Sequence, residues 1–317
     1  MRTAILTDSN CDLPQDLLYQ YDIRVIPTKV IVEGKIRYDN YHDFDRTQFY
    51  QSLLDGKKSP DLTIEAPSSE EFLQTYRKLC LDYDVILSIH ESSKFGDTVK
   101  NARQGAVDGS DTFKRLRLLK NIGAPFQIRI IDSKNTSLGL GLLVLRAAEL
   151  LTQQVSSTKL ANELEELADK IFLYLIPNDL GFLRNAKKGV KVGLLGAGLA
   201  SITDTKPVFA VHRGEIIQIE KKRGFDAAIN DAMQQVMKKL SEERSYDKVG
   251  ITYGGEASLL ETIETVTEFR VQLAGMGLGS LLSNLTPQVG IFMGPKSLGL
   301  SMIHSDINIT SVFSKPT

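Results

Sequence analysis

The first half of the chain alternates short strand-like runs with segments of helical periodicity, and this alternation constrains the fold more than any other feature. Runs rich in β-branched and aliphatic side chains occupy residues 3–7, 25–32, 85–89 and 127–131. Helical periodicity marks residues 72–81, 98–107 and 138–151. Ser68 and Glu71 form a capping box before the first of these helices, and Asp12 with Pro14 predicts another helix start. Strands that alternate with helices predict a doubly wound, mostly parallel α/β sheet.

The length of 317 residues suggests two domains at roughly 100–200 residues each. A polar stretch at residues 153–157 predicts the boundary, with a doubly wound α/β domain at 1–155 and a second α/β domain at 156–317. In the second domain, further helices are predicted at 160–170, 227–240 and 259–273, and further strands at 171–176, 248–253 and 298–303. A hairpin of residues 207–212 and 215–220 around Arg213 and Gly214 makes this second sheet a mixed one.

The charge balance argues against several classes of protein. Lys and Arg number 38 against 39 Asp and Glu, so nothing predicts a nucleic-acid or anionic-membrane partner. The longest uncharged stretch, residues 271–295, is interrupted by Gln, Asn, Pro and Gly and predicts no membrane span. Two cysteines and four scattered histidines predict neither a disulfide framework nor a metal site. A cytoplasmic protein without a metal cofactor is expected.

Polar residues follow three of the predicted parallel strands, at residues 7–10, 90–94 and 132–136. Because the carboxyl ends of parallel strands share one edge of the sheet, these residues are expected to line one hydroxyl-rich pocket there. Helix N-termini at this edge suit an anion or a carboxylate. Helix capping and turns would explain any one of the three stretches, but three together favour a site.

The contents of this pocket favour binding over catalysis. The candidates for a general base are Asp8, His90, Glu91 and Asp132. No Gly-x-Ser-x-Gly elbow surrounds Ser92 or Ser93, which argues against an activated nucleophile. His90 is predicted to be a satisfied polar residue within or beside a strand. Cys11 is predicted to be a small packed hydrophobe and not a reactive thiol.

Seven cations gather in two stretches of the second half, at residues 184–191 and 221–223. A solvated face explains such runs as well as a docking patch for an acidic or phosphorylated partner does. Glycine-rich stretches at residues 193–198, 275–279 and 294–297 lack the spacing of dinucleotide and phosphate loops and predict close backbone packing.

Several motifs, in order along nearly the whole chain, resemble those of the DegV family. They are Thr7-Asp8-Ser9 followed by Asp12-Leu13-Pro14, the serine-rich loop at 92–103, Ile131-Asp132-Ser133-Lys134 with the stretch at 137–141, and later blocks at 182–184, 220–224 and 294–300. Studied members of this family are the bacterial fatty acid-binding proteins of the fatty acid kinase system.

The resemblance implies a non-catalytic carrier with a two-domain fold related to dihydroxyacetone kinase. It would enclose a long-chain fatty acid in a tunnel, need no cofactor, and present the carboxylate to a separate kinase subunit. The carboxylate ligands carried over are Thr63, Ser92 and Ser93. Other pocket positions are Asp8, Ser9, Ile64, Thr98, Ser133 and Phe292, and possible kinase-docking positions are Arg184, Lys187, Lys188 and Arg223.

Three departures from the family pattern fall around the expected head group. Glu65 and Asp97 add acids there, which would repel a carboxylate unless they point away, and Phe292 stands where the family has a histidine. Burying about fifteen methylenes is worth roughly 12 kcal/mol gross, whereas a hydrogen bond to a charged group is worth about 1.5–3 kcal/mol. The departures are therefore expected to change the head group or its phosphorylation more than lipid binding.

Two alternatives belong to other functional classes. One is an enzyme of the related dihydroxyacetone-kinase-like fold that acts on a small polyol through His90 or Asp132, which needs a compact polar pocket. The other is a divergent interaction module that has lost lipid binding and uses the basic cluster. A long apolar site would favour the carrier over both.

Overall fold

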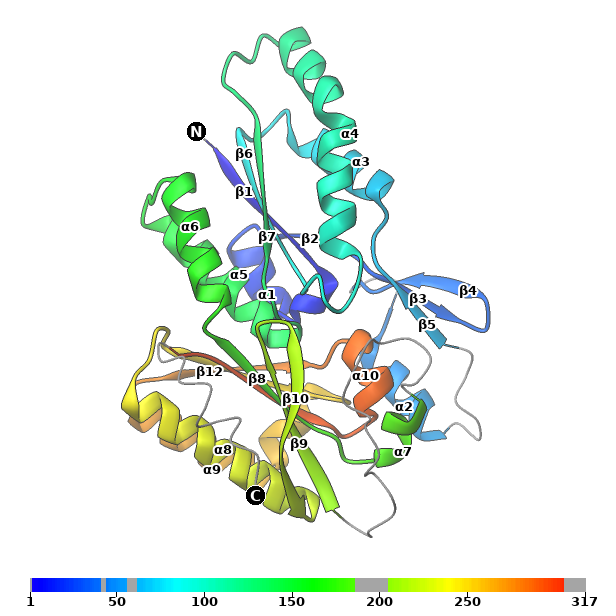
Figure 1. Cartoon of the computed structure of the whole chain (residues 1–317), viewed down its shortest axis with the longest axis vertical. Helices are drawn as coiled ribbons and strands as arrows, with labels where there is room; N and C mark the ends of the chain where they lie inside the picture. The colour runs from blue at the N-terminus through cyan, green and yellow to red at the C-terminus, as the bar shows by residue number, and fades with distance from the viewer. Residues whose placement is uncertain (1, 41–43, 56–61, 186–204, 305–317) are drawn as a thin grey trace.

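The computed structural model describes residues 2–40, 44–55, 62–185 and 205–304 (Figure 1). Its strands form three sheets. The first is a four-stranded parallel sheet in the order β2-β1-β6-β7, made of β1 (Thr3–Asp8), β2 (Arg24–Ile26), β6 (Val85–His90) and β7 (Gln127–Asp132). The predicted doubly wound α/β class is confirmed.

Helices cover both faces of the parallel sheet because successive strand residues point to opposite sides. Ile5 of β1 packs with α5 (Ser137–Thr152) and α6 (Ser157–Ala168), whereas the next residue, Leu6, packs with α3 (Ser69–Leu79) and α4 (Thr98–Leu119). The capping box at the start of α3 is confirmed, with Ser68 and Glu71 each accepting from the backbone N–H of the other. α1 (Gln15–Gln20) follows the 3-10 turn η1 (Ser9–Cys11).

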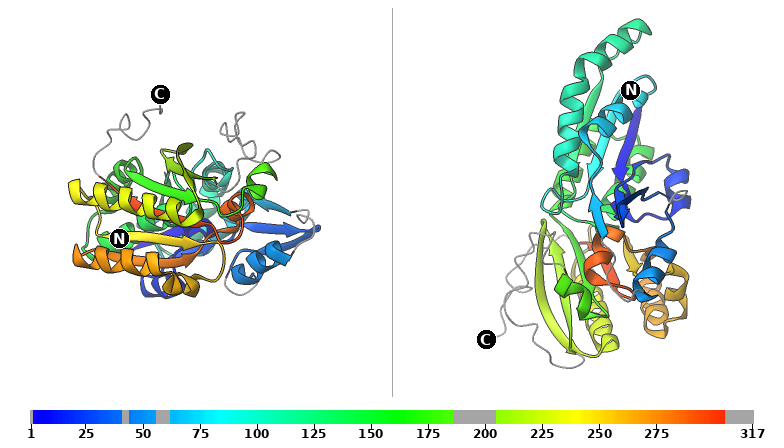
Figure 2. Two further views of the ribbon diagram at one scale, coloured as in Figure 1. Left: turned by 90° about the horizontal axis from the view of Figure 1, so that it is seen from below. Right: turned by 90° about the vertical axis from the view of Figure 1, so that its right-hand side faces the viewer.

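The second sheet has six strands in the order β10-β9-β8-β13-β11-β12 and is mixed, as predicted. Its strands are β8 (Ile171–Ile176), β9 (Thr205–His212), β10 (Glu215–Arg223), β11 (Lys248–Tyr253), β12 (Gly279–Asn284) and β13 (Leu298–Ile303). α8 (Phe225–Glu242) and α9 (Glu264–Gly275) lie side by side against one face (Figure 2). α5 packs against β11 and β13 and so touches both large sheets.

A small antiparallel sheet, in the order β4-β3-β5, completes the fold. Its strands are β3 (Lys29–Val32), β4 (Lys35–Tyr38) and β5 (Leu62–Glu65). Near it in Figure 1 lie three short helices, α2 (Arg46–Asp55), α7 (Leu180–Asn185) and α10 (Pro287–Met293). Elements from the first 65 residues thus pack beside elements from the last third of the chain. The boundary at residue 155 stays a proposal.

Four local predictions need correction. The run at residues 25–32 is two strands in different sheets, because Pro27 has no N–H for a ladder and separates β2 from β3. The helix predicted at 98–107 runs on to Leu119, and that at 259–273 divides into the 3-10 helix η3 (Ala257–Thr262) and α9. Asp12 caps no helix; it has a left-handed φ of 52° at the end of η1.

The part of the chain that the structure describes contains no helix long and apolar enough to cross a membrane. Within those same residues, no three or more His, Cys, Asp or Glu side chains are grouped as metal ligands would be.

Candidate functional site

An apolar cluster lies between the small sheet, the three short helices and one face of the six-stranded sheet. Its buried members are Val30, Phe44, Phe49, Tyr50, Leu53, Leu173, Leu175, Leu183, Phe209, Val211, Leu285, Val289 and Met293, and partly buried neighbours include Ile64, Leu62, Phe95, Phe182 and Ile291. These side chains come from seven elements and three loops across the sequence. They form a continuous apolar region beside the polar ends of β1 and β6.

The alternation of β5 decides which predicted residues face this cluster. Leu62 and Ile64 pack against the cluster, whereas Thr63 and Glu65 are exposed on the other face. Ile64 therefore contacts the apolar cluster, and its place in a ligand pocket stays a prediction. Thr63 does not face the cluster, and the added acid Glu65 points away from it.

Hydroxyl and amide groups border the cluster at the carboxyl end of β1. Ser9 Oγ and Thr28 Oγ1 lie 2.9 Å apart, and Ser9 Oγ also accepts from the Thr28 N–H at 3.0 Å. Thr286 Oγ1 donates to Asn10 Oδ1 at 2.7 Å. The buried Leu285 directly precedes Thr286, and the buried Val30 lies two residues after Thr28. The border is therefore amphipathic, with hydrogen-bonding groups on one side and aliphatic groups on the other.

The serine-rich loop after β6 reaches the same border. Ser92 is buried, and its Oγ accepts from the backbone N–H of Lys94 at 3.2 Å. The tip of the β9–β10 hairpin covers it, so closely that a Cβ on Gly214 would lie 2.8 Å from Ser92 Oγ. Phe95, three residues on, packs into the apolar cluster. Among the described residues the Ser92 hydroxyl proton has no acceptor, so Ser92 can donate to a ligand.

Ser93 lies differently from Ser92. It is exposed, and its hydroxyl donates to Asp132 Oδ2 at 2.5 Å. A ligand carboxylate at Ser93 would therefore meet the Asp132 carboxylate. The ligand roles of Ser92 and Ser93 stay predictions. Ser133 is also engaged locally, since its Oγ bridges the N–H and C=O of Asn135.

Thr98 and Asp97, at the start of α4, differ in their exposure to solvent. Thr98 is buried as the first residue of α4. Asp97, the added acid, is exposed and forms a weak ion pair with Lys100 at 3.5 Å.

Asp8 and His90 form a buried pair between β1 and β6. Asp8 Oδ2 lies 3.0 Å from His90 Nδ1 and accepts from the Glu91 N–H at 2.9 Å. His90 Nε2 lies 2.6 Å from Ser88 Oγ, which in turn contacts the Tyr76 hydroxyl. His90 is fully buried with both ring nitrogens engaged, as predicted for a satisfied polar residue.

Glu91 carries the most strongly perturbed carboxyl group of this edge. Thr136 Oγ1 lies 2.6 Å from Glu91 Oε1, and Asn10 Nδ2 lies 3.1 Å from Oε2. The side chain is buried and has no ion-pair partner among the described residues. Burial, reinforced by the nearby Asp8 charge, raises the pKa of Glu91 to about 8. Its place directly after a predicted strand was the signal in the sequence, which made Glu91 a candidate general base.

The sequence analysis missed Arg46, whose guanidinium joins the two halves of the molecule. All five of its N–H groups are used, on both oxygens of Asp39, on Asp12 Oδ1, and on the backbone carbonyls of Ser9 and Asn284. Asp12 also accepts from Ser137 and from the Thr286 N–H. Burial raises the pKa of Asp12 to about 6, although Arg46 opposes the shift.

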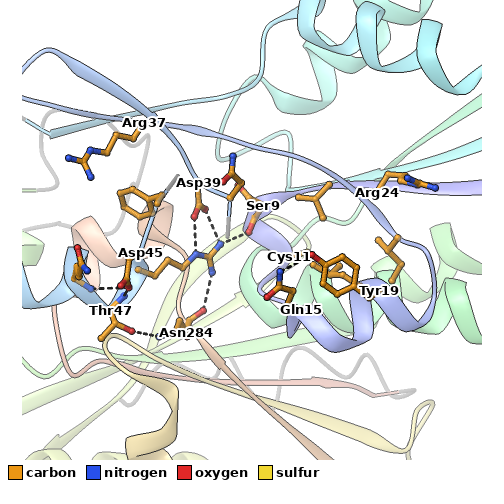
Figure 3. Close-up of a pocket in the computed structure, with 17 residues that line it drawn as sticks. Ser9, Cys11, Gln15, Tyr19, Arg24, Arg37, Asp39, Asp45, Thr47 and Asn284 are labelled. Carbon is orange, nitrogen blue, oxygen red and sulfur yellow. Dashed lines mark hydrogen bonds and ion pairs between the residues drawn. The ribbon is translucent and has the colours of Figure 1, made fainter. Parts of the chain in front are cut away.

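Beside Arg46 lies an open cavity of about 620 Å³ (Figure 3). It is lined by η1, α1, the start of β2, β4 with the segment after it, and the start of α2, with Asn284 from β12. Phe44 belongs both to this lining and to the apolar cluster. Cys11 lies at its edge, and burial raises the pKa of the Cys11 thiol to about 12, which fits the predicted packed, unreactive role.

The remaining predicted positions are only partly described. Phe292 is half-buried on α10, next to Ile291 of the apolar cluster. Arg223 is exposed at the end of β10, and Arg184 belongs to α7. Lys187 and Lys188 lie outside the described residues. The structure does not test the docking role of these four cations.

Known proteins resemble this chain from end to end. A DegV domain-containing protein of Xanthomonas axonopodis pv. citri is 28% identical over 307 residues, which cover 95% of this chain and 98% of the relative. One of Deinococcus radiodurans is 28% identical over 305 residues, covering 95% and 98%.

Solved structures share the fold. A DegV family protein of Thermus thermophilus, described by its fatty acid binding, superposes with a TM-score of 0.77 at 28% identity, over 96% of this chain and 100% of that one. DegV of Bacillus subtilis, described as a fatty acid-binding protein, has a TM-score of 0.76 at 22% identity, over 96% and 100%, which supports the fold alone.

The family model that describes an uncharacterised protein of the DegV family matches residues 2–305. This match spans both large sheets and every element that borders the apolar cluster. The chain belongs to the DegV family.

Proposed function

We propose that this protein binds one long-chain fatty acid, with the acyl chain in the apolar cluster and the carboxylate at Ser92. The observation that carries the proposal is the junction of that cluster with the buried Ser92 hydroxyl, whose proton is uncommitted among the described residues. The Thermus thermophilus relative, described by its fatty acid binding, supports the same ligand class.

The acyl tail and the carboxylate head group are expected to contribute differently to the binding free energy. Each buried methylene contributes about 0.8 kcal/mol before ordering costs, so the apolar cluster supplies most of the affinity. A hydrogen bond to a charged group contributes about 1.5–3 kcal/mol. In the Ser9–Thr28 pair one hydroxyl donates to the other, so the second hydroxyl proton is not used in that bond. This proton and that of Ser92 are the donors that select a carboxylate head group.

Extraction of the purified protein with organic solvent, followed by mass spectrometry, tests ligand binding directly. We expect a stoichiometric long-chain fatty acid, or saturable binding of added oleate to delipidated protein. A protein that yields no lipid and whose thermal stability ignores added oleate contradicts the proposal.

We further propose that the bound carboxylate is presented to a separate kinase subunit, and that this chain is a non-catalytic carrier in the cytoplasm. The exposed loop of Ser93 and Lys94 lies at the head-group end. The exposed Arg223 lies on the hairpin that covers Ser92, at the opposite end of β10 from the Gly214 turn. Arg184, Lys187 and Lys188 extend the proposed cationic docking surface along the sequence.

Phosphorylation of bound oleate by a bacterial fatty acid kinase subunit and ATP tests this presentation. Arg223→Glu should weaken the association with the subunit while oleate binding is unchanged. Equal turnover by the unaltered protein and the variant would remove Arg223 from the docking surface. The polyol-enzyme alternative has no comparable support, because His90 is fully buried and both of its ring nitrogens have partners.

A further inference from the structure

Glu91 lies between the start of α5 and the loop that carries Ser92 and Phe95. Its two carboxyl oxygens contact Thr136 and Asn10. On the loop side, a Cβ built on Gly96 would lie 4.0 Å from Glu91 Oε2, and it meets no nearer atom. The Glu91 carboxyl therefore lies beside Gly96 of the same loop, four residues after Ser92.

The surroundings of Glu91 offer little to neutralise a negative charge. Asp8 and His90 face it from β1 and β6, and Asp12 lies nearby at the end of η1. Arg46 of α2 is already bound to Asp12 and Asp39.

Among the described residues, the other elements that neighbour Glu91 offer no neutralising cation. At the start of α5, Thr136 contacts the Glu91 carboxyl directly. At the start of α10, Thr286 is linked to Glu91 only through Asn10. Neither threonine carries a charge. On the loop, Lys94 and Asp97 are exposed, and Lys94 pairs with Glu215. Ionisation of Glu91 would therefore add an uncompensated anion beside the head group.

Thr136 is the N-cap of the 16-residue α5, so the positive end of that helix faces Glu91. This field lowers the cost of a charge on Glu91 and makes the group able to ionise at accessible pH. The raised pKa of about 8 agrees with a carboxyl that changes charge in mildly alkaline solution.

We propose that Glu91 selects the head group of the bound acyl chain: as a neutral acid it accepts a carboxylate at Ser92, and as an anion it excludes one. An acyl compound with an uncharged head group is then bound equally well in both states. This inference rests on the proposed fatty acid binding.

The test compares oleate with oleyl alcohol, both below their micellar concentrations, on the delipidated full-length protein at pH values below and above the Glu91 pKa. Oleate affinity is expected to fall at least about tenfold across this range, a change equivalent to 1.4 kcal/mol of repulsion. Oleyl alcohol affinity should stay constant. Glu91→Gln should bind oleate independently of pH, whereas Asp132→Asn, which neutralises the half-buried acid beside Ser93, should keep the dependence.

The outcomes separate the two proposals. An oleate affinity that does not change with pH, or a Glu91→Gln variant that keeps the fall, overturns the role of Glu91 alone. Failure of both probes to bind at any pH overturns fatty acid binding and this inference with it. If Glu91→Gln does not fold, calorimetry of the unaltered protein in buffers of different ionisation heat gives a second test. Above the Glu91 pKa, the binding of oleate should be coupled to the uptake of one proton. Binding without proton uptake contradicts the proposal.

Discussion

The hydroxyl of Ser93 donates to Oδ2 of Asp132 at 2.5 Å, which separates the roles of two adjacent serines. Ser93 is held at the surface by an acid of β7, whereas Ser92 is buried against the Gly214 turn with its proton uncommitted among the described residues. Two hydroxyls that look equivalent in sequence therefore have different capacities to bind an anion.

The first prediction compares these two serines by alanine substitution. Ser92→Ala should weaken oleate binding by about 1.5–3 kcal/mol, because it removes a hydrogen bond to a charged group. Ser93→Ala should change the affinity less than about threefold. Titration calorimetry on the delipidated variants measures both, and a larger loss for Ser93→Ala would place the carboxylate on the other side of the loop.

The second prediction uses the two faces of β5. Ile64→Asn places an amide in the apolar cluster and should reduce oleate affinity at least about tenfold, because a buried polar group without a partner is costly. Thr63→Asn, one residue earlier on the exposed face, is the matched control and should bind oleate normally. Loss of binding in the Thr63 variant would restore Thr63 as a carboxylate ligand.

The third prediction concerns Arg46 as the link between the two halves. Arg46→Met leaves the buried Asp12 and Asp39 carboxylates without their cation and should lower the free energy of unfolding by about 3–5 kcal/mol. Arg24→Met removes the exposed pair with Asp22 and should cost less than about 1 kcal/mol. Urea denaturation gives both values; similar losses would mean that Arg46 does not join the halves.

The fourth prediction is a fall in stability as the pH rises. The folded protein holds the pKa of Asp12 at about 6 and that of Glu91 at about 8, both above their ordinary values. Between the ordinary and raised values the folded state binds more protons than the unfolded state, so stability decreases with increasing pH. Asp12 contributes up to about pH 6 and Glu91 up to about pH 8.

Glu91→Gln isolates the upper part of this dependence. The variant should show a flatter curve of unfolding free energy over the whole range from the ordinary Glu91 pKa of 4.5 to its raised value of about 8. Above about pH 6 the fall should disappear, and below about pH 6 only the part that Asp12 contributes should remain. Chemical denaturation at several pH values measures the curve. A slope that is identical in the variant would assign the effect to another group.

Local chemistry made several elements predictable. The Ser68–Glu71 capping box set the start of α3, and Arg213 with Gly214 set the β9–β10 hairpin, since both take left-handed φ values at its turn. The carboxyl-end residues of β1, β6 and β7 do meet at one edge, as parallel strands require. These predictions needed only neighbours in the sequence or a common strand direction.

What the sequence left open depends on contacts between distant segments. Arg46 could not be recognised because its partners lie up to 238 residues away. The inward face of β5 follows from its pairing with β3, which no local pattern indicates over four residues. The bond from Ser93 to Asp132 joins residues 39 positions apart, so the sequence did not distinguish Ser93 from Ser92.

A crystal structure of the delipidated protein soaked or co-crystallised with oleate tests the central claim most directly. We expect continuous acyl density through the apolar cluster, past Ile64 and Leu285, with a carboxylate oxygen within hydrogen-bonding distance of Ser92 Oγ. Density for the lipid elsewhere, or a filled apolar cluster with no ligand at saturating oleate, would contradict it.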